Sequence, residues 1–195
     1  MRKVTLFIVI AGFLITACTK KQEKEMKEFQ KVSIEDINVS AAKLIGKDWM
    51  LITAGKDTAS FNTMTASWGC LGYLWEKPVA IVYIRPQRYT KEFVDNNNIF
   101  TLSFFDTTYR NALTICGTKS GRDTDKVAEA GITPYNTPAG SVAFEQANMV
   151  MECKKLYAMP FNPEFFIDTN IISHIYPDND FHTIYIAEII NVYRK

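Results

Sequence analysis

The sequence contains few of the residues that build metal sites. It has two histidines, His174 and His182, and four cysteines, none of which forms a Cys-x-x-Cys pair or a zinc spacing. Three of the cysteines, Cys70, Cys116 and Cys153, follow the N-terminal region, and an odd number argues against a disulfide framework. We therefore expect no metal site and interpret these three cysteines as small buried hydrophobic residues.

The chain also lacks an excess of either charge. Its 22 Lys and Arg residues and 21 Asp and Glu residues give a formal net charge of +1, so there is no general attraction for nucleic acid. Motifs of the GxGxxG, GxSxG and HExxH types do not occur. The glycines of Gly117–Gly121 (GTKSG) do not have the spacing of a P-loop. Any anion must therefore be bound by a local group of residues.

Residues 1–17 have the features of a secretory signal. A basic start is followed by the apolar run Val4–Ile15, which is too short to span a bilayer easily. The cysteine at position 18 directly follows Leu-Ile-Thr-Ala, which resembles a bacterial lipoprotein signal in which that cysteine is acylated. We expect a lipid anchor at Cys18, membrane attachment and a place in the bacterial cell envelope, on its periplasmic or outer-membrane face. The alternative is an ordinary signal peptide with a chance cysteine.

The rest of the chain divides into a tether and one domain. Residues 18–36 include the charged stretch TKKQEKEMKEFQK, which has few apolar residues to bury and is typical of a solvated spacer. Residues 37–195 form the expected domain, and the chain is 47% hydrophobic and 13% aromatic, enough to fill one core.

Hydrophobic periodicity predicts a mainly β domain with short helices. Strands are expected at 49–55, 59–68, 79–85, 99–105, 142–157, 165–176 and 181–193, and helices at 90–96, 109–116 and 123–130. Turns are expected at Lys56–Asp57 and Pro177–Asp180, and Gly131 should end the last of these helices. Because strands and helices do not alternate regularly, we expect an antiparallel barrel or sandwich.

The segment IRPQRYT, residues 84–90, places two arginines at the end of an apolar strand. Thr90 is expected to cap the next helix, whose first N–H groups and dipole favour an anion. Arg85 and Arg88 can add forked, charge-assisted hydrogen bonds. These groups match a single phosphate. The alternative is an exposed loop with both arginines in water.

Two further stretches supply groups for a ligand. In 61–69 (FNTMTASWG), polar groups of Asn62, Thr63, Thr65 and Ser67 stand beside the apolar Met64, Ala66 and Trp68, a mixture that suits a flat heterocycle. In 116–126 (CGTKSGRDTDK), two glycines free the backbone and Lys119, Ser120 and Arg122 are within reach of a phosphate. The alternatives are a strand with a polar outer face and a helix-capping loop with solvated lysines.

These stretches together resemble the flavin reductase-like proteins of the FMN-binding split barrel family, in particular the flavoredoxin-like branch. The resemblance covers about residues 40–193. It lies in the ordered segments NTMTASWGCLGYLW, KPVAIVYIRPQRYT, FTLSFF, CGTKSGRDTDK and FHTIYIAEI. It implies a Greek-key split β-barrel that forms a homodimer and binds FMN at the subunit interface.

The resemblance also implies roles for individual residues. Those expected to line the isoalloxazine ring and ribityl chain are Asn62, Thr63, Met64, Thr65 and Ser67. Those expected at the phosphate are Arg85, Arg88, Tyr89 and Thr90, with Ser120 and Arg122 from the later loop. Trp68 is a candidate for stacking near the ring, its alternative being a core position. No catalytic side chain is required, and His182 is the one candidate, its alternative being a satisfied histidine at a strand start.

The sequence thus predicts an FMN-dependent, flavin reductase-like oxidoreductase that passes electrons to flavin or to a protein partner. NAD(P)H is the donor that the resemblance implies, but export would separate the protein from cytosolic nicotinamide cofactors, so a redox protein is the other candidate donor. One alternative is a non-catalytic flavin-binding carrier lipoprotein of the cell envelope. Another is a split barrel that has lost its flavin.

Overall fold

The computed structural model describes residues 29–195. The expected signal peptide, Cys18 and most of the expected tether lie outside the described residues. The strands are β1 (Gln30–Val32), β2 (Met50–Asp57), β3 (Ser60–Ala66), β4 (Gly69–Leu74), β5 (Lys77–Ile84), β6 (Ile99–Phe104), β7 (Pro134–Asn136), β8 (Val142–Phe144), β9 (Met149–Pro160) and β10 (Thr183–Arg194). The helices are η1 (Ile34–Asp36), α2 (Ala41–Lys43), η2 (Leu44–Asp48), α3 (Tyr89–Asn96), η3 (Thr107–Tyr109), α4 (Arg110–Thr118), α5 (Lys126–Glu129), η4 (Pro163–Phe165) and α6 (Asn170–Ile175).

An antiparallel sheet organises the structure, as the sequence predicts. Its strand order is β3-β2-β6-β9-β10-β5-β4, β1 pairs with β10, and β7 and β8 form a separate pair. Because β1 belongs to this sheet, the fold includes residues of the expected tether, 18–36. The apolar strand β5 is not an edge strand, since it pairs with both β4 and β10.

The sheet curls until its two edge strands approach each other. β3 and β4 lie at opposite ends of the strand order, yet only Ser67 and Trp68 separate them in sequence. Such a short link can join the edges only if the sheet closes on itself, with a gap where β3 and β4 do not pair. The result is a barrel that is open along one seam.

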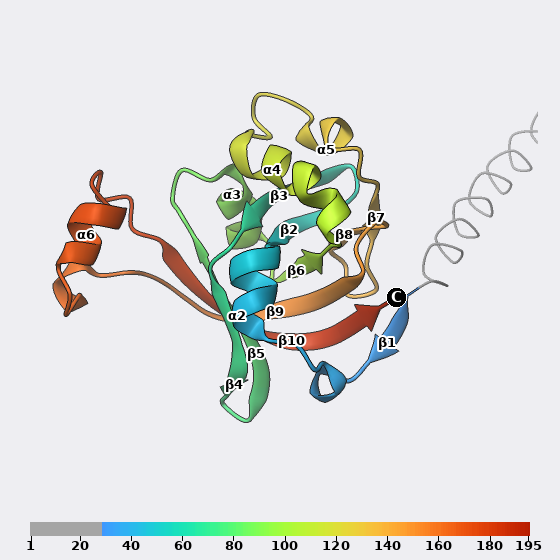
Figure 1. The fold of residues 1–195 in the computed structure, drawn as a ribbon, viewed down its shortest axis with the longest axis horizontal. Coiled ribbons are helices and arrows are strands. Elements are labelled where there is room, and N and C mark those ends of the chain that lie inside the picture. Colours follow the sequence, from blue (N-terminus) through green and yellow to red (C-terminus); the bar gives the residue numbers. More distant parts are fainter. Residues whose placement is uncertain (1–28) are drawn as a thin grey trace, which may run out of the picture.

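The core has two parts. One fills the barrel, with fully buried side chains such as Phe100, Leu102 and Tyr185. The other lies between the sheet and α4, α5 and β8, around Leu113 and Phe144. Figure 1 shows α3, α4 and α5 gathered on one side of the sheet, and the segment between β9 and β10 extending away from the barrel.

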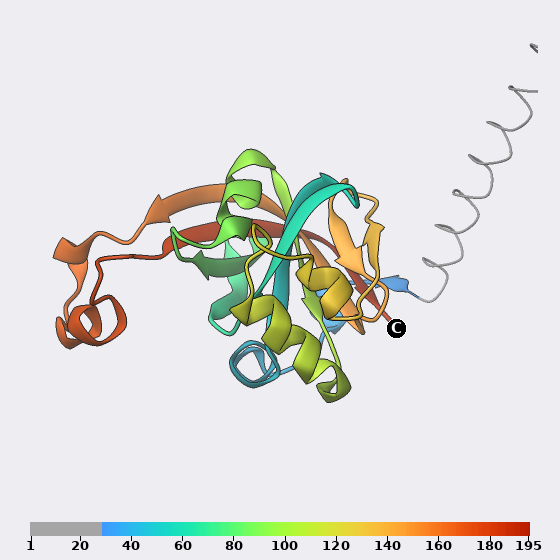
Figure 2. The same ribbon diagram turned by 90° about the horizontal axis from the view of Figure 1, so that it is seen from above.

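That extending segment, residues 161–182, corrects the sequence-based prediction of a strand at 165–176. It contains η4 and α6 instead, and in both ribbon views it leaves the barrel (Figures 1 and 2). The apolar alternation at 165–176 does not produce a strand because no described strand lies beside it to pair with. We refer to residues 161–182 as the arm.

Four smaller differences between the structure and the sequence-based prediction are local. β4 was not predicted because Gly69 and Gly72 interrupt its pattern, and it forms through pairing with β5. The turn expected at Lys56–Asp57 lies at residues 58–59, since β2 continues through a bulge after Gly55. Residues 41–48, for which no element was predicted, form α2 and η2. Cys116 and Cys153 are buried as expected, but Cys70 is exposed on β4.

Among residues 29–195, no helix has the length and apolar character needed to cross a membrane.

Candidate functional site

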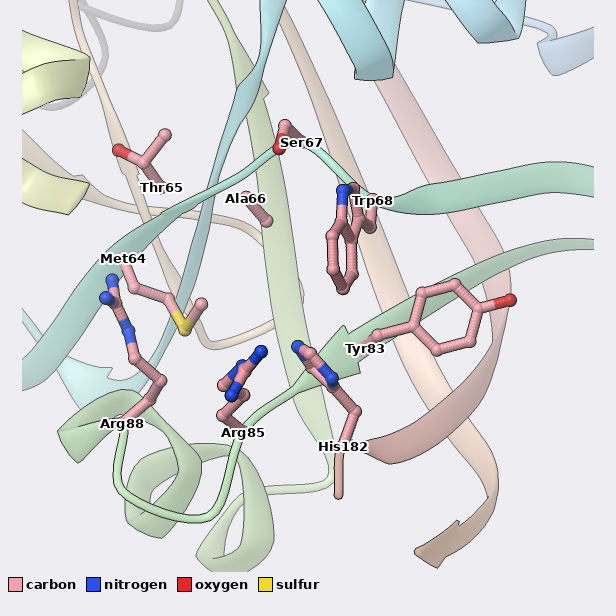
Figure 3. A pocket seen from close by; sticks show the side chains of 9 residues that line it. All are labelled: Met64, Thr65, Ala66, Ser67, Trp68, Tyr83, Arg85, Arg88 and His182. Carbon is pink, nitrogen blue, oxygen red and sulfur yellow. The ribbon is translucent and has the colours of Figure 1, made fainter. Parts of the chain in front are cut away.

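A cavity of about 300 Å³ opens at the seam of the barrel. It lies where the end of β3, the link from β3 to β4, the end of β5 and the start of β10 converge (Figure 3). Its lining consists of Met64, Thr65, Ala66, Ser67, Trp68, Tyr83, Arg85, Arg88 and His182. The structure therefore brings together Arg85 and Arg88 with the 64–68 stretch, two groups that were singled out separately in the sequence.

One wall of the cavity is apolar. Met64 and Ala66 are buried against the barrel core, whereas Trp68 remains 47% exposed. The indole of Trp68 faces the imidazole of His182, with ring centroids 5.2 Å apart. Trp68 is thus part of the cavity rather than of the core, and its exposed face is available to a flat aromatic ligand.

Arg88 supplies positive charge at the other end. It occupies the N-cap position of α3, and its Nη1 donates to the Gly117 carbonyl at 2.8 Å. Burial lowers the pKa of its guanidinium because the charged form is desolvated. Among the described residues Arg88 forms no ion pair, so its charge remains available to an anion.

Arg85, by contrast, is bound by the arm. Its Nη1 donates to the Asp180 carboxylate, its Nη2 donates to the Ile175 carbonyl at 2.8 Å, and its guanidinium lies 5.3 Å from the centre of the Tyr176 ring. Asp180 also accepts from the Gln87 amide at 2.6 Å. Both terminal nitrogens of Arg85 therefore already have protein partners, so its fork is not free in this structure, and binding of a phosphate by Arg85, which lines the cavity, stays a prediction.

His182 lines the cavity next to the first residue of β10. It is 7% exposed, and its Nδ1 lies 2.8 Å from the Tyr176 hydroxyl. Burial, followed by the positive charge of Arg85, lowers the pKa of His182 to about 4, although Asp180 opposes the change. The imidazole is consequently neutral near pH 7, and it can offer one ring nitrogen to the cavity as a donor or an acceptor.

The hydroxyl groups of two predicted ring-lining residues have partners inside the protein. Thr63 is fully buried, and its Oγ1 bonds with Oγ1 of Thr53 at 2.8 Å, so it does not reach the cavity. The Thr65 hydroxyl donates to the Leu113 carbonyl on α4, and its side chain points away from the arginines in Figure 3. The strand alternation turns both side chains to the face opposite Met64. The prediction is corrected for Thr63, whereas Thr65 still lines the cavity but with its hydroxyl already bonded to the protein.

A second group of predicted residues meets around the start of α3. The Asn62 amide donates to the Thr90 hydroxyl at 2.8 Å, and Arg122 stacks over Tyr89 at 4.5 Å and pairs with Glu92. Thr90 is therefore not the helix cap. The helix begins one residue earlier, at Tyr89, and no side chain caps it.

The loop after α4 packs closely against this group. A Cβ atom on Gly121 would lie 2.2 Å from Oδ1 of Asn62, so only glycine allows this approach. Ser120 accepts a hydrogen bond from the Arg122 backbone N–H at 3.2 Å, which shapes the turn. This loop borders a separate cavity of about 390 Å³ lined by residues 61–62 and 121–127. Asn62, Ser120 and Arg122 thus lie beside the first cavity rather than in its lining.

Two residues near the site were not predicted. Tyr83 lines the cavity, and strand periodicity could have found it, because Tyr83 and Arg85 are two residues apart on the same strand end. Lys126 is only 3% exposed, and its ammonium donates to the Cys116 and Lys119 carbonyls at 3.5 and 3.3 Å. Burial, followed by repulsion from Arg88, lowers the pKa of Lys126 to about 8. No local sequence signal marks this lysine as buried.

Within residues 29–195, no cluster of three or more His, Cys, Asp or Glu side chains is arranged to hold a metal ion.

The comparisons with known proteins agree with this geometry. Residues 42–195 match the flavin reductase like domain family. Flavoredoxin of Desulfovibrio vulgaris (Miyazaki F) is similar in structure, with a TM-score of 0.60, 21% identity and coverage of 85% of this chain and 77% of that one. No curated protein matches the sequence significantly.

Two other solved structures have the same fold. An FMN-binding domain of a flavin reductases-like enzyme from Shewanella baltica OS155 has a TM-score of 0.60 and 16% identity, over 85% of this chain and 76% of that one. An NADH:FAD oxidoreductase of Streptomyces globisporus C-1027 has a TM-score of 0.58 and 14% identity, over 76% and 75%. The open barrel therefore has the flavin reductase-like split-barrel fold. The chain belongs to the flavin reductase-like family.

The cavity suits the group that the family implies. A flavin nucleotide combines a flat aromatic ring with phosphate, and the cavity combines the exposed face of Trp68 with Arg88, which has no ion pair among the described residues. His182, next to Trp68, adds a neutral hydrogen-bonding group rather than a further fixed charge.

Proposed function

We propose that this protein is an FMN-binding oxidoreductase that transfers electrons through the bound flavin to free flavin or to a protein partner. The observation that carries the proposal is the cavity at the barrel seam, where an apolar wall ends at Arg88, an arginine with no carboxylate partner within residues 29–195. Membership of the flavin reductase-like family supports the same conclusion.

In this proposal the residues act by binding and orientation. Met64, Ala66 and Trp68 pack against the ring, and Arg88 binds the phosphate together with the first N–H groups of α3. Thr90, Tyr89, Ser120 and Arg122 surround this helix start and hold the loop beside it. The flavin supplies the redox chemistry when bound, and the protein sets its position and hydrogen bonding.

The neutral state of His182 bears on its role. With Nδ1 engaged by Tyr176, the remaining ring nitrogen can hydrogen-bond to a ligand without adding charge next to Arg85. We assign His182 to orientation of the ring and expect no obligatory acid or base among the side chains of the cavity.

A homodimer is part of the proposal. The arm presents large apolar side chains to solvent: Phe165 is 76% exposed, Ile167 is fully exposed and Ile171 is 40% exposed. Leu156, Tyr157 and Met159 continue this surface onto the end of β9. A monomer would gain nothing from exposing these groups together, whereas a second copy would bury them beside the seam that holds the cavity.

The setting of the proposed activity follows from the N-terminal sequence. If Cys18 carries a lipid, the protein works at the bacterial cell envelope, where a reduced protein is a more accessible donor than NAD(P)H. The related structures include both a flavoredoxin and an NADH:FAD oxidoreductase. Both kinds of donor therefore belong in the test.

The proposal is tested by titrating the full-length chain, purified in mild detergent, with FMN while following flavin fluorescence. Saturable binding followed by bleaching of the visible flavin band with NADPH, NADH or a dithiol protein, and recovery in air, supports the oxidoreductase. Binding without reduction by any of these donors supports a flavin carrier instead. Failure to bind FMN contradicts both and leaves a split barrel that uses its fold for other contacts.

A further inference from the structure

The arm contacts the barrel through aromatic rings at its base, where Phe161 stacks on Tyr83 and His182 packs against Trp68, and through a small set of side-chain hydrogen bonds. Apart from β9 and β10 themselves, the side-chain hydrogen bonds between residues 161–182 and the rest of the described chain come from Arg85 and Gln87. Both residues lie in the short connection between β5 and α3. The side-chain hydrogen bonds that hold the arm in place beside the cavity therefore come from this connection.

Arg85 engages the arm through three different interactions. One terminal nitrogen binds the Asp180 carboxylate, the other binds the Ile175 carbonyl, and the guanidinium face covers the Tyr176 ring. The guanidinium fork is thus used by the protein, and its charge is balanced by Asp180. Hydrogen bonds from Gln87 and Arg85 lower the pKa of the Asp180 carboxyl, which keeps this carboxylate charged.

The contacts continue from Arg85 into the cavity. Tyr176 stacks between Arg85 and Phe181, with its ring 4.8 Å from that of Phe181, and its hydroxyl bonds Nδ1 of His182. His182 in turn packs against Trp68. A continuous chain of contacts therefore runs from Asp180 through Arg85, which itself lines the cavity, and Tyr176 to His182 and the aromatic wall.

Arg88, three residues later, is different. Its guanidinium donates to the neutral Gly117 carbonyl, and its positive charge acts on the buried ammonium of Lys126. Arg88 has no ion pair with a carboxylate of residues 29–195, and a buried or partly buried cation without such a partner favours a bound anion.

We propose that Arg85 and Arg88 have separate roles. Arg88 binds the phosphate, whereas Arg85 is a positioning residue that, paired with Asp180, fastens the arm and so places Tyr176 and His182 beside the flavin ring. The role of Arg85 toward the ring rests on the proposed function, but its role toward the arm does not.

Riboflavin, which lacks the phosphate, separates the two roles. For Arg88→Ala we expect FMN affinity to fall roughly 10- to 150-fold, as for loss of a charged hydrogen bond, with riboflavin affinity unchanged. For Arg85→Ala and for Asp180→Asn we expect both flavins to bind more weakly by the same factor, roughly 2- to 12-fold. The ratio of FMN to riboflavin affinity then falls in Arg88→Ala only.

Two results would overturn the division of roles. If Arg85→Ala lowers the ratio as Arg88→Ala does, Arg85 binds the phosphate directly. If Asp180→Asn raises FMN affinity and the ratio, Asp180 competes with the phosphate for Arg85 rather than fastening the arm.

A measurement without flavin tests the arm alone. In the full-length chain, Arg85→Ala and Asp180→Asn should each increase hydrogen exchange in residues 161–182 and alter the fluorescence of Trp68, and the double variant should do no more than either single variant. Lys77→Ala is the matched control, because it breaks the ion pair between Lys77 and Glu188 at the far end of β5. If hydrogen exchange in the arm stays at the wild-type rate in both single variants, Arg85 and Asp180 do not fasten the arm.

The flavin titrations and the hydrogen-exchange measurement also separate this inference from the proposed function. If the wild type binds no flavin, the proposed function fails, while the exchange measurement still decides whether Arg85 and Asp180 fasten the arm. Asp180→Asn preserves the shape of the side chain, so it remains informative if Arg85→Ala does not fold.

Discussion

The hydroxyl oxygen of Tyr176 lies 2.8 Å from Nδ1 of His182, and this contact within the arm connects Tyr176 to a residue that lines the cavity. It fixes the orientation of the imidazole and leaves the second ring nitrogen for the cavity. His182 is neutral because it is buried among aromatic rings and faces the positive charge of Arg85.

The lowered pKa of His182 should therefore make the free energy of unfolding depend on pH in the acidic range. Its pKa is about 4 in the folded protein and 6.5 in the reference state, so between these values the unfolded chain takes up a proton that the folded chain does not. The free energy of unfolding should fall as the pH drops from 6.5 to about 4. His182→Gln should remove this part of the slope in urea titrations, and identical slopes for both proteins would refute the assignment.

Lys126 should produce a similar effect in the basic range. Its pKa is about 8 in the folded protein against 10.5 in the reference state, so the unfolded chain binds more protons between these values. The stability of the wild type relative to Lys126→Met should consequently rise from pH 8 to 10.5. Lys119→Met, in the same loop but more exposed, serves as the control. A difference that stays constant with pH would contradict the burial of a charged Lys126.

Gly121 should tolerate no side chain. In Gly121→Ala the new Cβ would overlap the Asn62 amide oxygen, and the loop would have to shift away from β3. We expect a loss of stability of about 1–3 kcal/mol, the range for overpacking, measured by urea unfolding. Gly72→Ala is the control, since a Cβ on Gly72 meets nothing within 4 Å. Equal stability of the two variants would show that the loop does not pack as described.

The apolar arm should decide the oligomeric state. The double substitution Phe165→Ser and Ile167→Ser removes large exposed side chains from the arm and should convert the proposed homodimer to a monomer. Light scattering coupled to gel filtration measures the mass. Tyr73→Ser, at the exposed β4–β5 hairpin, provides the control. A wild type that is already monomeric would exclude the dimer.

Much of the fold could be predicted because its signals are local. The apolar run before Arg85 identified β5, the alternation at 61–68 identified β3, and Gly131, with its positive φ, ends the helical segment that contains α5 as predicted. The arm could not be predicted in this way. Its sequence has the apolar residues of a strand, but a strand also needs a neighbour, and only the tertiary structure shows that none is present among the described residues.

Part of the candidate site could also be predicted from local sequence signals. Residues 64–68, Arg85 and Arg88 stand out locally, and they do line one cavity. The arm residues that bind the Arg85 guanidinium could not be found from the local sequence, because Asp180 is 95 residues away from Arg85. Thr63 and Thr65 were assigned to the ligand from their polar side chains and from the family resemblance, whereas the structure gives their hydroxyls protein partners.

The central claim is that the cavity binds FMN through its phosphate at Arg88, and paired titrations of the full-length wild type with FMN and with riboflavin test it most directly. The account predicts saturable binding of both, with FMN tighter by about 1.5–3 kcal/mol, the contribution of a charge-assisted hydrogen bond. Equal affinity for the two flavins, or no binding of either, would contradict it.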